Sequence, residues 1–488
     1  MKNSELIVYL VENKSLGKLP QKQLLADLGF KGFHGETAFL PETPSMYLGL
    51  ELKPVKTTDP FYKIDYYALG AILGTKLRST KYRKLQIDSK SLTVNLDPQN
   101  CLDLALGVRQ GAWKFTKFLK KEKEEKGQFY LDFGVDMGKD WCSKLDALDS
   151  GINLTRTLVE ETPEDLNPSM ISNLVKQEIG SFEKMSIQIH EKAHLEELGM
   201  RSILAVGRAS IHAPVLVHAI LKPKNQAKNK IVLIGKGLTY DSGGLDIKTG
   251  GHMRTMKMDM GGAGLMMGVM KTLGSLGIGN TEIHWLSAFV ENMVGGDAYK
   301  TDDVITTHSG QTVEIWNTDA EGRMTLADVL SYATELDPDF IIDAATLTGA
   351  CIAANSDYYT GLMGNDESLI NGLMEAFIST NEPTEKNPLP EDLRQYVKGE
   401  ISDLVNTSSL KGQAGHITAG LFLSHFIDQN LFRPPHSEIK KPKCFPWAHL
   451  DVAGSVYNSG HNQLKTKGAT GQSVRGLVEW ILKLDKNN

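Results

Sequence analysis

Apolar residues in the second half of the chain fall into two alternating patterns. Short continuous apolar runs, which predict strands buried on both faces, occupy residues 231–234, 283–290, 340–345 and 449–452. Longer stretches with apolar residues three or four positions apart, which predict helices, occupy residues 263–273, 324–336 and 419–426. Buried strands that alternate with helices predict an α/β domain whose mostly parallel central sheet is covered by helices on both faces.

The first 150 residues show a weaker mixture of the same kind. Residues 6–10 and 92–96 are strand-like and residues 102–121 are helical in pattern, without an evident chemical motif. Residues 148–190 have a polar, helical pattern, and Thr162, Pro163, Glu164 and Asp165 resemble the start of a helix. We predict a smaller N-terminal α/β domain at 1–147, a helical linker at 148–161 and a larger C-terminal α/β domain at 162–488.

The composition argues against several classes of protein. The 488 residues carry a net charge of -6, so no overall basic field would attract nucleic acid or anionic lipid. The four cysteines form no C-x-x-C pair, which argues against a disulfide scaffold or a thiolate zinc site. No apolar run approaches the roughly 20 residues that cross a bilayer. We expect a cytoplasmic protein without a membrane partner.

Three glycine-rich segments adjoin the predicted strands and helices of the larger domain. Residues 235–248 follow the strand at 231–234, residues 256–264 lead into the helix at 263–273, and residues 317–323 lead into the helix at 324–336. Each segment places carboxylates beside glycines, which let the backbone approach a ligand closely. Because ligands of open α/β sheets bind beyond the carboxyl ends of the strands, we expect the segments to meet there.

The carboxylates of these segments would together carry four negative charges. They belong to Asp241, Asp259, Asp319 and Glu321. If the fold brings them together, their repulsion requires cations, and two divalent ions would supply four positive charges. Taken singly, Asp319 could be only a helix cap and Arg323 only a surface ion-pair residue.

Two lysines of the first segment could assist a metal site in different ways. A lysine beside two metal ions can lose its proton and become a nitrogen ligand, because the ions depress its pKa. A second lysine can keep its charge and polarise a carbonyl group. The candidates for these two roles are Lys236 and Lys248.

Two competing motifs are present. Residues 190–194 read H-E-x-x-H, which on a helix binds one zinc ion, but the third ligand of such sites is missing and charged residues flank the motif, so we expect a solvated helix. Gly262, Gly264 and Gly268 resemble a phosphate-binding loop, but no buried strand precedes them. Neither G-x-S-x-G nor C-G-x-C-W occurs, so serine and cysteine hydrolases lack support.

Residues 317–323, N-T-D-A-E-G-R, resemble the signature of the leucine aminopeptidase (cytosol aminopeptidase) family. Residues 235–248 and 258–263 are similar to the metal-ligand stretch of that family, and residues 291–293, 345–350 and 447–454 resemble further family segments. The resemblance extends from about Thr162 to the C-terminus. Met324 stands where the family usually has leucine and Ala209 where it usually has glycine, which indicates a divergent branch.

The resemblance implies a binuclear metal site. In this site Asp241 and Glu321 bridge two divalent ions, Lys236 and Asp259 belong to the tighter-held ion, and Asp319 completes the more exchangeable one. Zinc is the expected metal, with manganese or magnesium as alternatives at the exchangeable position.

The resemblance also implies two catalytic residues outside the metal shell, Lys248 and Arg323. In the family, Arg323 holds a bicarbonate ion that acts as the general base, helped by the backbone near Leu347. The implied reaction removes the first residue of a peptide with a free N-terminus: a metal-bound hydroxide attacks the peptide carbonyl, and Lys248 and the metals stabilise the charge that develops.

A substrate pocket and an assembly follow from the same resemblance. The implied pocket residues are Met256, Asn317, Thr346, Leu347, Gly349, Ile417, Ala453 and Val456. Met256 and Val456 indicate an apolar pocket for leucine-like or methionine-like residues, and the family forms homohexamers. The alternative is a catalytically inactive family member that serves as a scaffold or binds nucleic acid. The presence of all seven metal and catalytic residues argues against inactivity, and the net charge gives nucleic-acid binding no support.

Overall fold

The computed structural model of the chain describes residues 5–19, 21–41, 43–52, 55–88, 96–120, 128–410, 412–431, 442–460 and 467–487. The chain divides into two compact units, Met1–Asp149 with Ser459–Gly468, and Ser150–Asn458 with Ala469–Asn488. The division falls within α4 (Gly138–Glu160), so residues 148–160 are the second half of one continuous helix.

The smaller unit contains a five-stranded sheet of order β2-β3-β1-β4-β5, in which only the β2–β3 pair is antiparallel. Its elements are β1 (Glu5–Val11), η1 (Asn13–Lys18), α1 (Lys22–Asp27), β2 (Thr37–Leu40), β3 (Ser45–Gly49), α2 (Tyr66–Leu77), β4 (Lys84–Asp88), α3 (Pro98–Ala112) and β5 (Tyr130–Asp132). The predicted strand at residues 6–10 is confirmed, whereas residues 92–95 lie outside the described ranges. The helix predicted at 102–121 ends at Ala112, because Trp113 adopts an extended backbone.

The larger unit is built on a nine-stranded sheet of order β15-β14-β17-β13-β8-β10-β7-β6, with β9 also paired to β10. The central strands β17, β13, β8 and β10 are parallel, as predicted. The pairs β6–β7, β7–β10 and β14–β17 are antiparallel, and β14 pairs parallel with β15. The strands are β6 (Met185–His190), β7 (Val215–Leu221), β8 (Asn229–Gly235), β9 (Gly237–Asp241), β10 (Thr281–Asn292), β13 (Phe340–Ala345), β14 (Thr360–Gly364), β15 (Thr384–Lys386) and β17 (Trp447–Asp451).

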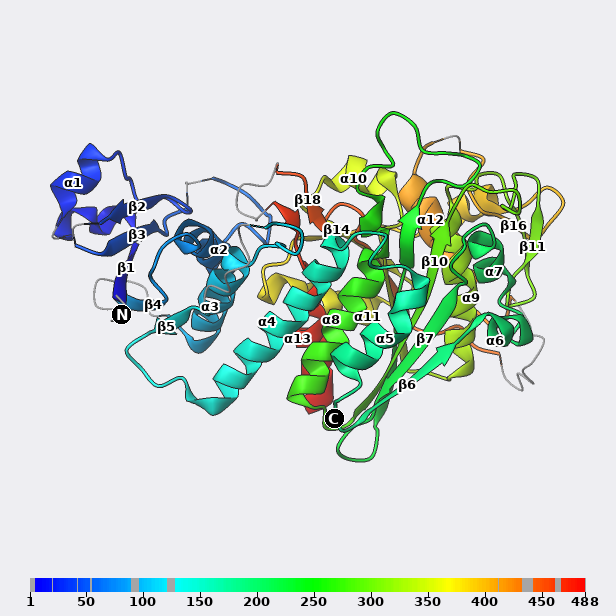
Figure 1. Ribbon diagram of the computed structural model, residues 1–488, viewed down its shortest axis with the longest axis horizontal. Helices are drawn as coiled ribbons and strands as arrows, with labels where there is room; N and C mark the ends of the chain where they lie inside the picture. Colours follow the sequence, from blue (N-terminus) through cyan, green and yellow to red (C-terminus); the bar gives the residue numbers. More distant parts are fainter. Residues whose placement is uncertain are drawn as a thin grey trace. The chain divides into compact units, whose positions relative to one another are not determined.

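Helices cover both faces of this sheet, as the sequence pattern predicted (Figure 1). The helices α8, α11 and α13 lie on one side, and α7, α9 and α12 lie on the other. The helical elements are α5 (Pro168–Ile179), α6 (Lys192–Glu197), α7 (Arg201–Gly207), η3 (Met256–Met260), α8 (Gly261–Leu276), α9 (Glu321–Glu335), α10 (Gly349–Asn355), α11 (Glu367–Ser379), η4 (Glu391–Val397), α12 (Gly415–Ser424) and α13 (Val474–Asn487). Two small sheets complete the unit: β11 (Val304–Thr306), β12 (Thr312–Glu314) and β16 (Leu404–Val405), and β18 (Tyr457–Asn458) with β19 (Gly468–Ala469).

Two predictions between residues 160 and 197 are wrong. The helix expected to begin at Thr162 begins instead at Pro168 with Asn167 as its cap, because Thr162 closes a turn by accepting hydrogen bonds from the backbone N–H groups of Asp165 and Leu166. The end of the polar segment, residues 185–190, forms the strand β6 and not a helix. Its sequence M-S-I-Q-I-H alternates apolar and polar residues, which is the period of a strand at the sheet edge.

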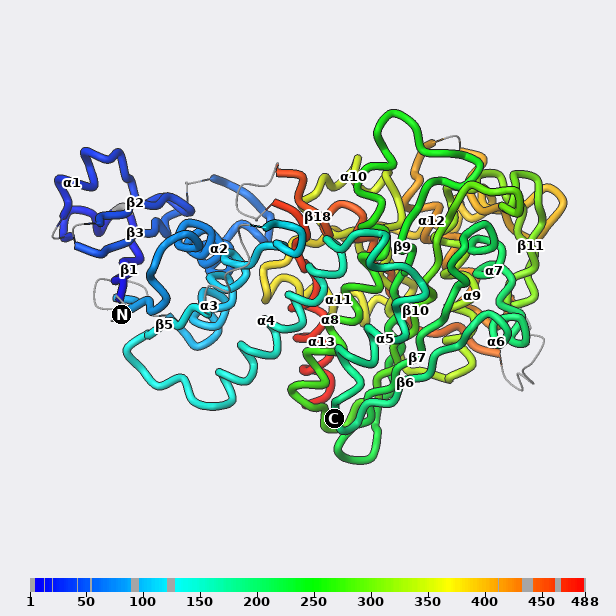
Figure 2. The backbone as a smooth tube through the Cα atoms, in the orientation of Figure 1, coloured from blue at the N-terminus to red at the C-terminus, as the bar shows by residue number. Residues whose placement is uncertain are grey.

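The topology brings the chemically interesting loops to one end of the sheet. The strands β8 and β13 run parallel and adjacent, and each is followed at its carboxyl end by a loop with polar side chains. The helices α8 and α9 begin at Gly261 and Glu321, beside the same loops. Figure 2 shows β6, β7 and β10 side by side in the same unit. None of the helices in the described ranges combines the length and apolar character that a bilayer-spanning segment requires.

Candidate metal centre

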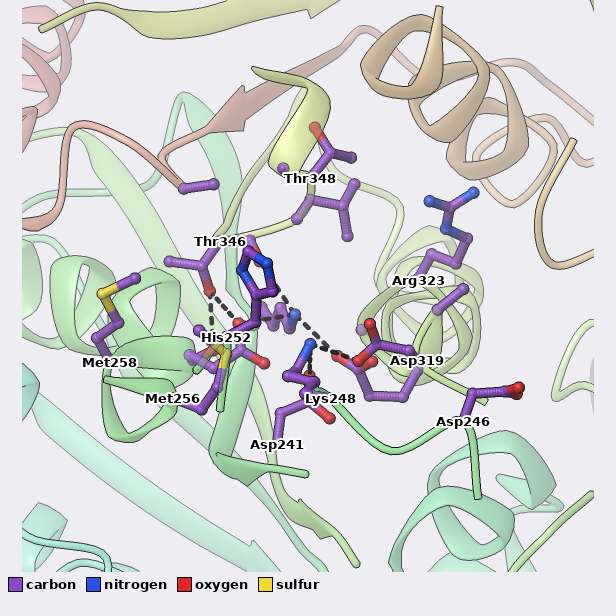
Figure 3. Close-up of a pocket in the computed structure, with 18 of the residues that line it drawn as sticks. Asp241, Asp246, Lys248, His252, Met256, Met258, Asp319, Arg323, Thr346 and Thr348 are labelled. Carbon is purple, nitrogen blue, oxygen red and sulfur yellow. Dashed lines mark hydrogen bonds and ion pairs between the residues drawn. The ribbon is translucent and has the colours of Figure 1, made fainter. Parts of the chain in front are cut away.

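The three glycine-rich segments meet in one cavity of about 460 Å³ at the carboxyl ends of the central strands. Figure 3 shows Asp241, Lys248 and Asp319 grouped in its centre, with Met256 and Met258 to one side. All seven residues predicted as metal ligands or catalytic groups line this cavity: Lys236, Asp241, Lys248, Asp259, Asp319, Glu321 and Arg323.

Three carboxylates form the core of the site. One oxygen from each of Asp241, Asp319 and Glu321 lies within 4.8 Å of the other two. Asp241 ends β9, Asp319 lies in the loop before α9, and Glu321 is the first residue of α9. The side chain of Asp319 is 32% exposed, whereas those of Asp241 and Glu321 are 3% and 2% exposed. The open side of the cluster is therefore at Asp319.

Two lysines cross between the carboxylates. The Nζ atom of Lys236 lies 2.9 Å from Asp259 Oδ1 and 2.9 Å from Glu321 Oε1, and it donates a hydrogen bond to the carbonyl of Thr346. Lys248 lies 2.8 Å from Asp241 Oδ2 and also contacts Asp319. Lys236 immediately follows β8, whereas Lys248 lies in the loop beyond β9. The two lysines therefore reach the carboxylates from different segments of the chain.

The pKa values show how crowded these charges are. Burial, followed by repulsion from Asp241, raises the pKa of Glu321 to about 8. Burial raises the pKa of Asp259 to about 6, even though Lys236 acts in the opposite direction. Burial alone would lower the pKa of Lys236, but the attraction of Asp259, Glu321 and Asp241 raises it. The cavity therefore holds more negative charge than its two lysines offset.

The donor set fits divalent metal ions. Asp259 Oδ2 and Glu321 Oε2 are buried without a hydrogen-bond partner among the described residues. A buried carboxylate oxygen without a donor is unfavourable unless a cation binds it. Carboxylate oxygens with one amine nitrogen suit Mg²⁺, Mn²⁺ or Zn²⁺, so the residues present can hold such ions.

Two further residues orient the carboxylates, a function that the sequence pattern predicted for neither of them. Asn292, the last residue of β10, is fully buried and donates hydrogen bonds to Asp241 Oδ1 at 2.8 Å and to the carbonyl of Thr318 at 3.0 Å. Thr346, predicted as a pocket residue, donates to Asp259 Oδ1 at 2.7 Å. Both follow or end central strands, which is the only signal that could have selected them.

Glycines are required where the backbone approaches these side chains. A Cβ atom at Gly322 would lie 2.4 Å from Lys236 Cε, so only glycine leaves room for the lysine beside Glu321. Gly243 and Gly244 have φ angles of +87° and +65°, a conformation that favours glycine. The turn that they form holds the carboxylate of Asp241 in place, because the Gly243 N–H donates a hydrogen bond to Asp241 Oδ1 at 2.9 Å.

Arg323 lies on the first turn of α9 but outside the carboxylate cluster. In Figure 3 its guanidinium group extends away from Asp319 and Lys248. Its Nε atom is buried without a hydrogen-bond partner among the described residues, and burial lowers its pKa to about 10. Arg323 therefore keeps its charge at neutral pH and can hold an anion at the cavity wall.

The predicted pocket residues fall into two groups. Met256, Thr346, Leu347, Gly349 and Ala453 line the cavity. The remaining three, Asn317, Ile417 and Val456, are not among its lining residues. Asn317 accepts a hydrogen bond from the backbone N–H of Asp319, and Val456 is buried beside Gly261. The cavity is also lined by residues outside the predicted set, among them His252, Met258, Thr348 and Ile352.

The competing motifs have other roles in the fold. His190 is the buried last residue of β6, so the solvated helix expected at residues 190–194 is wrong for this residue, and α6 begins only at Lys192. Gly262 and Gly268 lie inside α8 and not in a loop. Added Cβ atoms there would lie 2.0 Å from the carbonyl of Ala344 and 2.1 Å from Thr155 Oγ1, so these glycines allow close helix packing.

Comparisons with known proteins show the family to which this chain belongs. A model of the cytosol aminopeptidase family, catalytic domain, matches residues 153–478. A probable cytosol aminopeptidase of Wolinella succinogenes is 34% identical over 96% of this chain and 94% of its own length, and one of Aquifex aeolicus is 37% identical over 100% and 96%.

Two solved structures share the fold. The cytosol aminopeptidase of Coxiella burnetii superposes with a TM-score of 0.82 at 29% identity, covering 99% of this chain and 98% of its own. The bottromycin maturation enzyme BotP in complex with Mn superposes with a TM-score of 0.82 at 25% identity, covering 99% and 100%. This chain therefore belongs to the cytosol aminopeptidase family and is a metallo-aminopeptidase.

Proposed function

We propose that this metallo-aminopeptidase uses two metal ions to remove apolar residues, leucine-like or methionine-like, from the N-termini of peptides. The observation that carries the proposal is the cluster of Asp241, Asp319 and Glu321, whose oxygens lie within 4.8 Å of one another in a cavity open at Asp319. Two divalent ions would balance the four carboxylates that otherwise share only two lysines.

The five ligands divide between two positions. Asp241 and Glu321 would bridge the ions, Lys236 and Asp259 would hold the inner ion, and Asp319 would complete the outer one. The exposure of Asp319 supports an exchangeable outer position. We expect Zn²⁺, with Mn²⁺ or Mg²⁺ as alternatives at that position. When bound, the ions supply Lewis acidity and an activated water molecule.

Lys248 and Arg323 would carry out the remaining chemistry. With metal ions to neutralise Asp241 and Asp319, the Lys248 ammonium could donate to the oxygen of the scissile carbonyl as charge develops there. Arg323 would hold a bicarbonate ion near Leu347, and this anion would accept and return protons. The buried, unpartnered Nε of Arg323 supports an anion at that place.

The cavity wall supports an apolar first residue in the substrate. Met256, Met258, Leu347 and Ile352 line the cavity beside the charged groups. A free peptide amine would bind among the carboxylates and metal ions, whereas an apolar side chain would bury itself against this wall. A charged first residue would lose its hydration against these apolar side chains.

The assembly and compartment are further parts of the proposal. We propose a homohexamer in the cytoplasm, in keeping with the family resemblance and with the name cytosol aminopeptidase that relatives carry. We propose no nucleic-acid or membrane partner. Light scattering of the purified protein should give about six times the chain mass of 53.7 kDa, and a monomer would contradict the hexamer.

The central test measures hydrolysis of leucine-p-nitroanilide before and after complete metal removal. We expect activity to disappear on chelation and to return with Zn²⁺ or Mn²⁺, with two ions bound per chain by mass spectrometry. Glu321→Ala should bind neither ion and should not turn over substrate. Full activity of the chelated protein would refute the mechanism. A metal-loaded protein that cleaves no peptide would instead favour an inactive scaffold, which nothing in the described structure supports.

A further inference from the structure

A second cluster of titratable side chains lies on the sheet near its β6 edge. It contains His190 at the end of β6, His218 on β7, His284 on β10 and the exposed His194 on α6. In the strand registers Gln188 and Leu286 lie opposite His218. Because residues two apart on a strand share a face, His190, His218 and His284 form a diagonal row on one face of the sheet. None of them contributes to the metal cavity.

A carboxylate fixes the tautomers of two of these rings. His284 Nε2 lies 3.0 Å from Glu282 Oε1 and therefore donates its proton to the carboxylate. His284 Nδ1 must then accept, and His218 Nε2, 2.8 Å away, must donate to it. This relay leaves His218 Nδ1 with a free lone pair. That nitrogen is buried and has no hydrogen-bond partner among the described residues.

The adjacent ring shows the same pattern. His190 Nδ1 lies 3.2 Å from His194 Nδ1, so one of the two donates to the other. When His190 donates, its Nε2 atom carries a lone pair, and this atom is also buried without a partner among the described residues. His190 and His218 are 6% and 4% exposed, and their ring centroids are 6.4 Å apart. Tyr332 of α9 packs edge-on against both rings.

Both rings are neutral at neutral pH. Burial, followed by the charge of His194, lowers the pKa of His190. Burial, followed by His284 and His190, lowers the pKa of His218 to about 4. Two neutral imidazoles with unpartnered lone pairs cannot hydrogen-bond to each other through those nitrogens, but each nitrogen can bind a cation. Metal-binding histidines commonly donate their second ring nitrogen to an acceptor, as His218 does to His284 and as His190 does in the tautomer that donates to His194.

We propose that His190 and His218 form a second metal site that binds a divalent transition cation, Zn²⁺ or Cu²⁺, through imidazole nitrogen. Nitrogen donors favour these ions over Mg²⁺ and Mn²⁺, which the carboxylate centre accepts. The exposed His194, whose ring lies 4.5 Å from that of His190, provides the route from solvent. Glu321 and Tyr332 are eleven residues apart on α9, about 16 Å along a helix, so the two sites are separate.

The test uses the full-length protein saturated with Mg²⁺, to which one equivalent of Cu²⁺ is added. We expect an electron paramagnetic resonance spectrum with splitting from imidazole nitrogens. His190→Gln and His218→Gln should each lower Cu²⁺ affinity at least tenfold, whereas His212→Gln, outside the cluster, should not change it. The same spectrum should appear in Glu321→Gln, in which the carboxylate centre is impaired.

The outcomes separate the two sites. Unchanged Cu²⁺ affinity in His190→Gln and His218→Gln, or an equal loss in His212→Gln, would overturn the proposal. If a buried variant fails to fold, His194→Ala serves instead and should slow Cu²⁺ uptake, and wild-type protein without nitrogen splitting would also overturn it. Peptide hydrolysis by the Zn²⁺-loaded enzyme should be unaffected by His190→Gln, because this site takes no part in it.

Discussion

At the residue scale, two of the four carboxylates of the metal centre are oriented by neutral donors. Asn292 holds Asp241, and Thr346 holds Asp259, so one oxygen of each is fixed while the rest of the carboxylate remains available to a cation. Such donors orient metal ligands without adding charge. The two lysines differ from these donors because they are charged. They offset part of the negative charge that bound metal ions would otherwise balance.

Lys248→Met should separate catalysis from metal binding. The substitution keeps the length of the side chain but removes the ammonium that would stabilise the developing oxyanion. We expect kcat to fall roughly 10²- to 10³-fold, the usual effect of losing one such donor, with both metal ions still bound by mass spectrometry. The matched control is Lys271→Met, which removes a partly exposed lysine of α8 that pairs with Glu178 of α5. This variant should leave kcat unchanged. Full kcat in Lys248→Met would remove this residue from the catalytic set.

The charged residues of the site could be predicted from the sequence, but their neutral partners could not. Asp241, Asp259 and Glu321 stand beside glycines next to predicted strands and helices, and their combined charge demands an explanation. Asn292 carries no charge and resembles any polar residue at the end of a strand. Its function depends on the loop carrying Thr318, which becomes its neighbour only when the sheet forms.

At the element scale, the start of α9 carries much of the chemistry. Glu321 is its first residue, so the carboxylate lies at the positive end of the helix dipole. Gly322 follows directly and gives the buried side chain of Lys236 room to pass. The spacing of Glu321, Gly322 and Arg323 would therefore place the proposed metal ligand, the gap for Lys236 and the proposed anion-binding residue within one turn.

Gly322→Ala should damage the metal site more than the helix. Alanine is the better helix former, but its Cβ would displace Lys236, which is held by Asp259 and Glu321. We expect metal affinity, measured by calorimetric titration, to fall about 10- to 100-fold. Gly264→Ala in the first turn of α8 is the control, since its nearest neighbour would be 3.5 Å away. Equal metal affinity in the two variants would show that Lys236 needs no such gap.

The end of α12 should make the protein sensitive to acid. Burial, followed by Arg394, lowers the pKa of His425 to about 4, although Glu391 and Asp428 act in the opposite direction. The unfolded chain therefore takes up this proton first, and stability is lost as the pH falls from about 6.5 towards 4, by up to roughly 3 kcal/mol. Urea unfolding at pH 7 and pH 4.5 should show a smaller loss in His425→Gln. Equal losses in the variant and the wild type would contradict this account.

Helices and strands whose apolar residues follow a clear pattern could be predicted from the sequence. Segments in which strand and helix patterns mix could not. The strands predicted at residues 231–234, 283–290 and 340–345 are present as β8, β10 and β13, because their apolar runs are buried on both faces. The strand β6 was missed because it follows a long polar helical pattern and is only half-buried at the sheet edge. The start of α5 was misplaced because the residues at Thr162 fit a turn as well as a helix cap.

At the scale of the whole molecule, the two units have separate cores. One cluster contains Leu25, Phe30 and Tyr47 of the smaller unit, and another contains Ile234, Leu286 and Phe422 of the larger unit. The α/β character of both could be predicted from the sequence. The histidine row could not, because His190, His218 and His284 come from three strands whose order in the sheet depends on long-range pairing.

Metal ions should stabilise the larger unit in particular, because all the residues of the proposed metal centre lie in it. Crowding of the carboxylates makes the metal-free cavity unfavourable, and a ligand at 100 times its Kd adds about 2.7 kcal/mol to the folded state. We expect the Tm to rise by roughly 5 °C or more. Tryptophan fluorescence can follow this transition, because four of the six tryptophans lie in the larger unit: Trp285, Trp316, Trp447 and Trp480.

Glu321→Gln provides the control for this linkage. Without metal, the variant should unfold at a temperature no lower than the wild type, because the pKa of Glu321 is raised to about 8 and its ionised form is unfavourable in the cavity. With saturating Zn²⁺, the order should reverse, since only the wild type retains all the ligands that bind both ions. If Zn²⁺ raised both Tm values equally, the stabilisation would come from elsewhere, and Glu321 would not be a ligand.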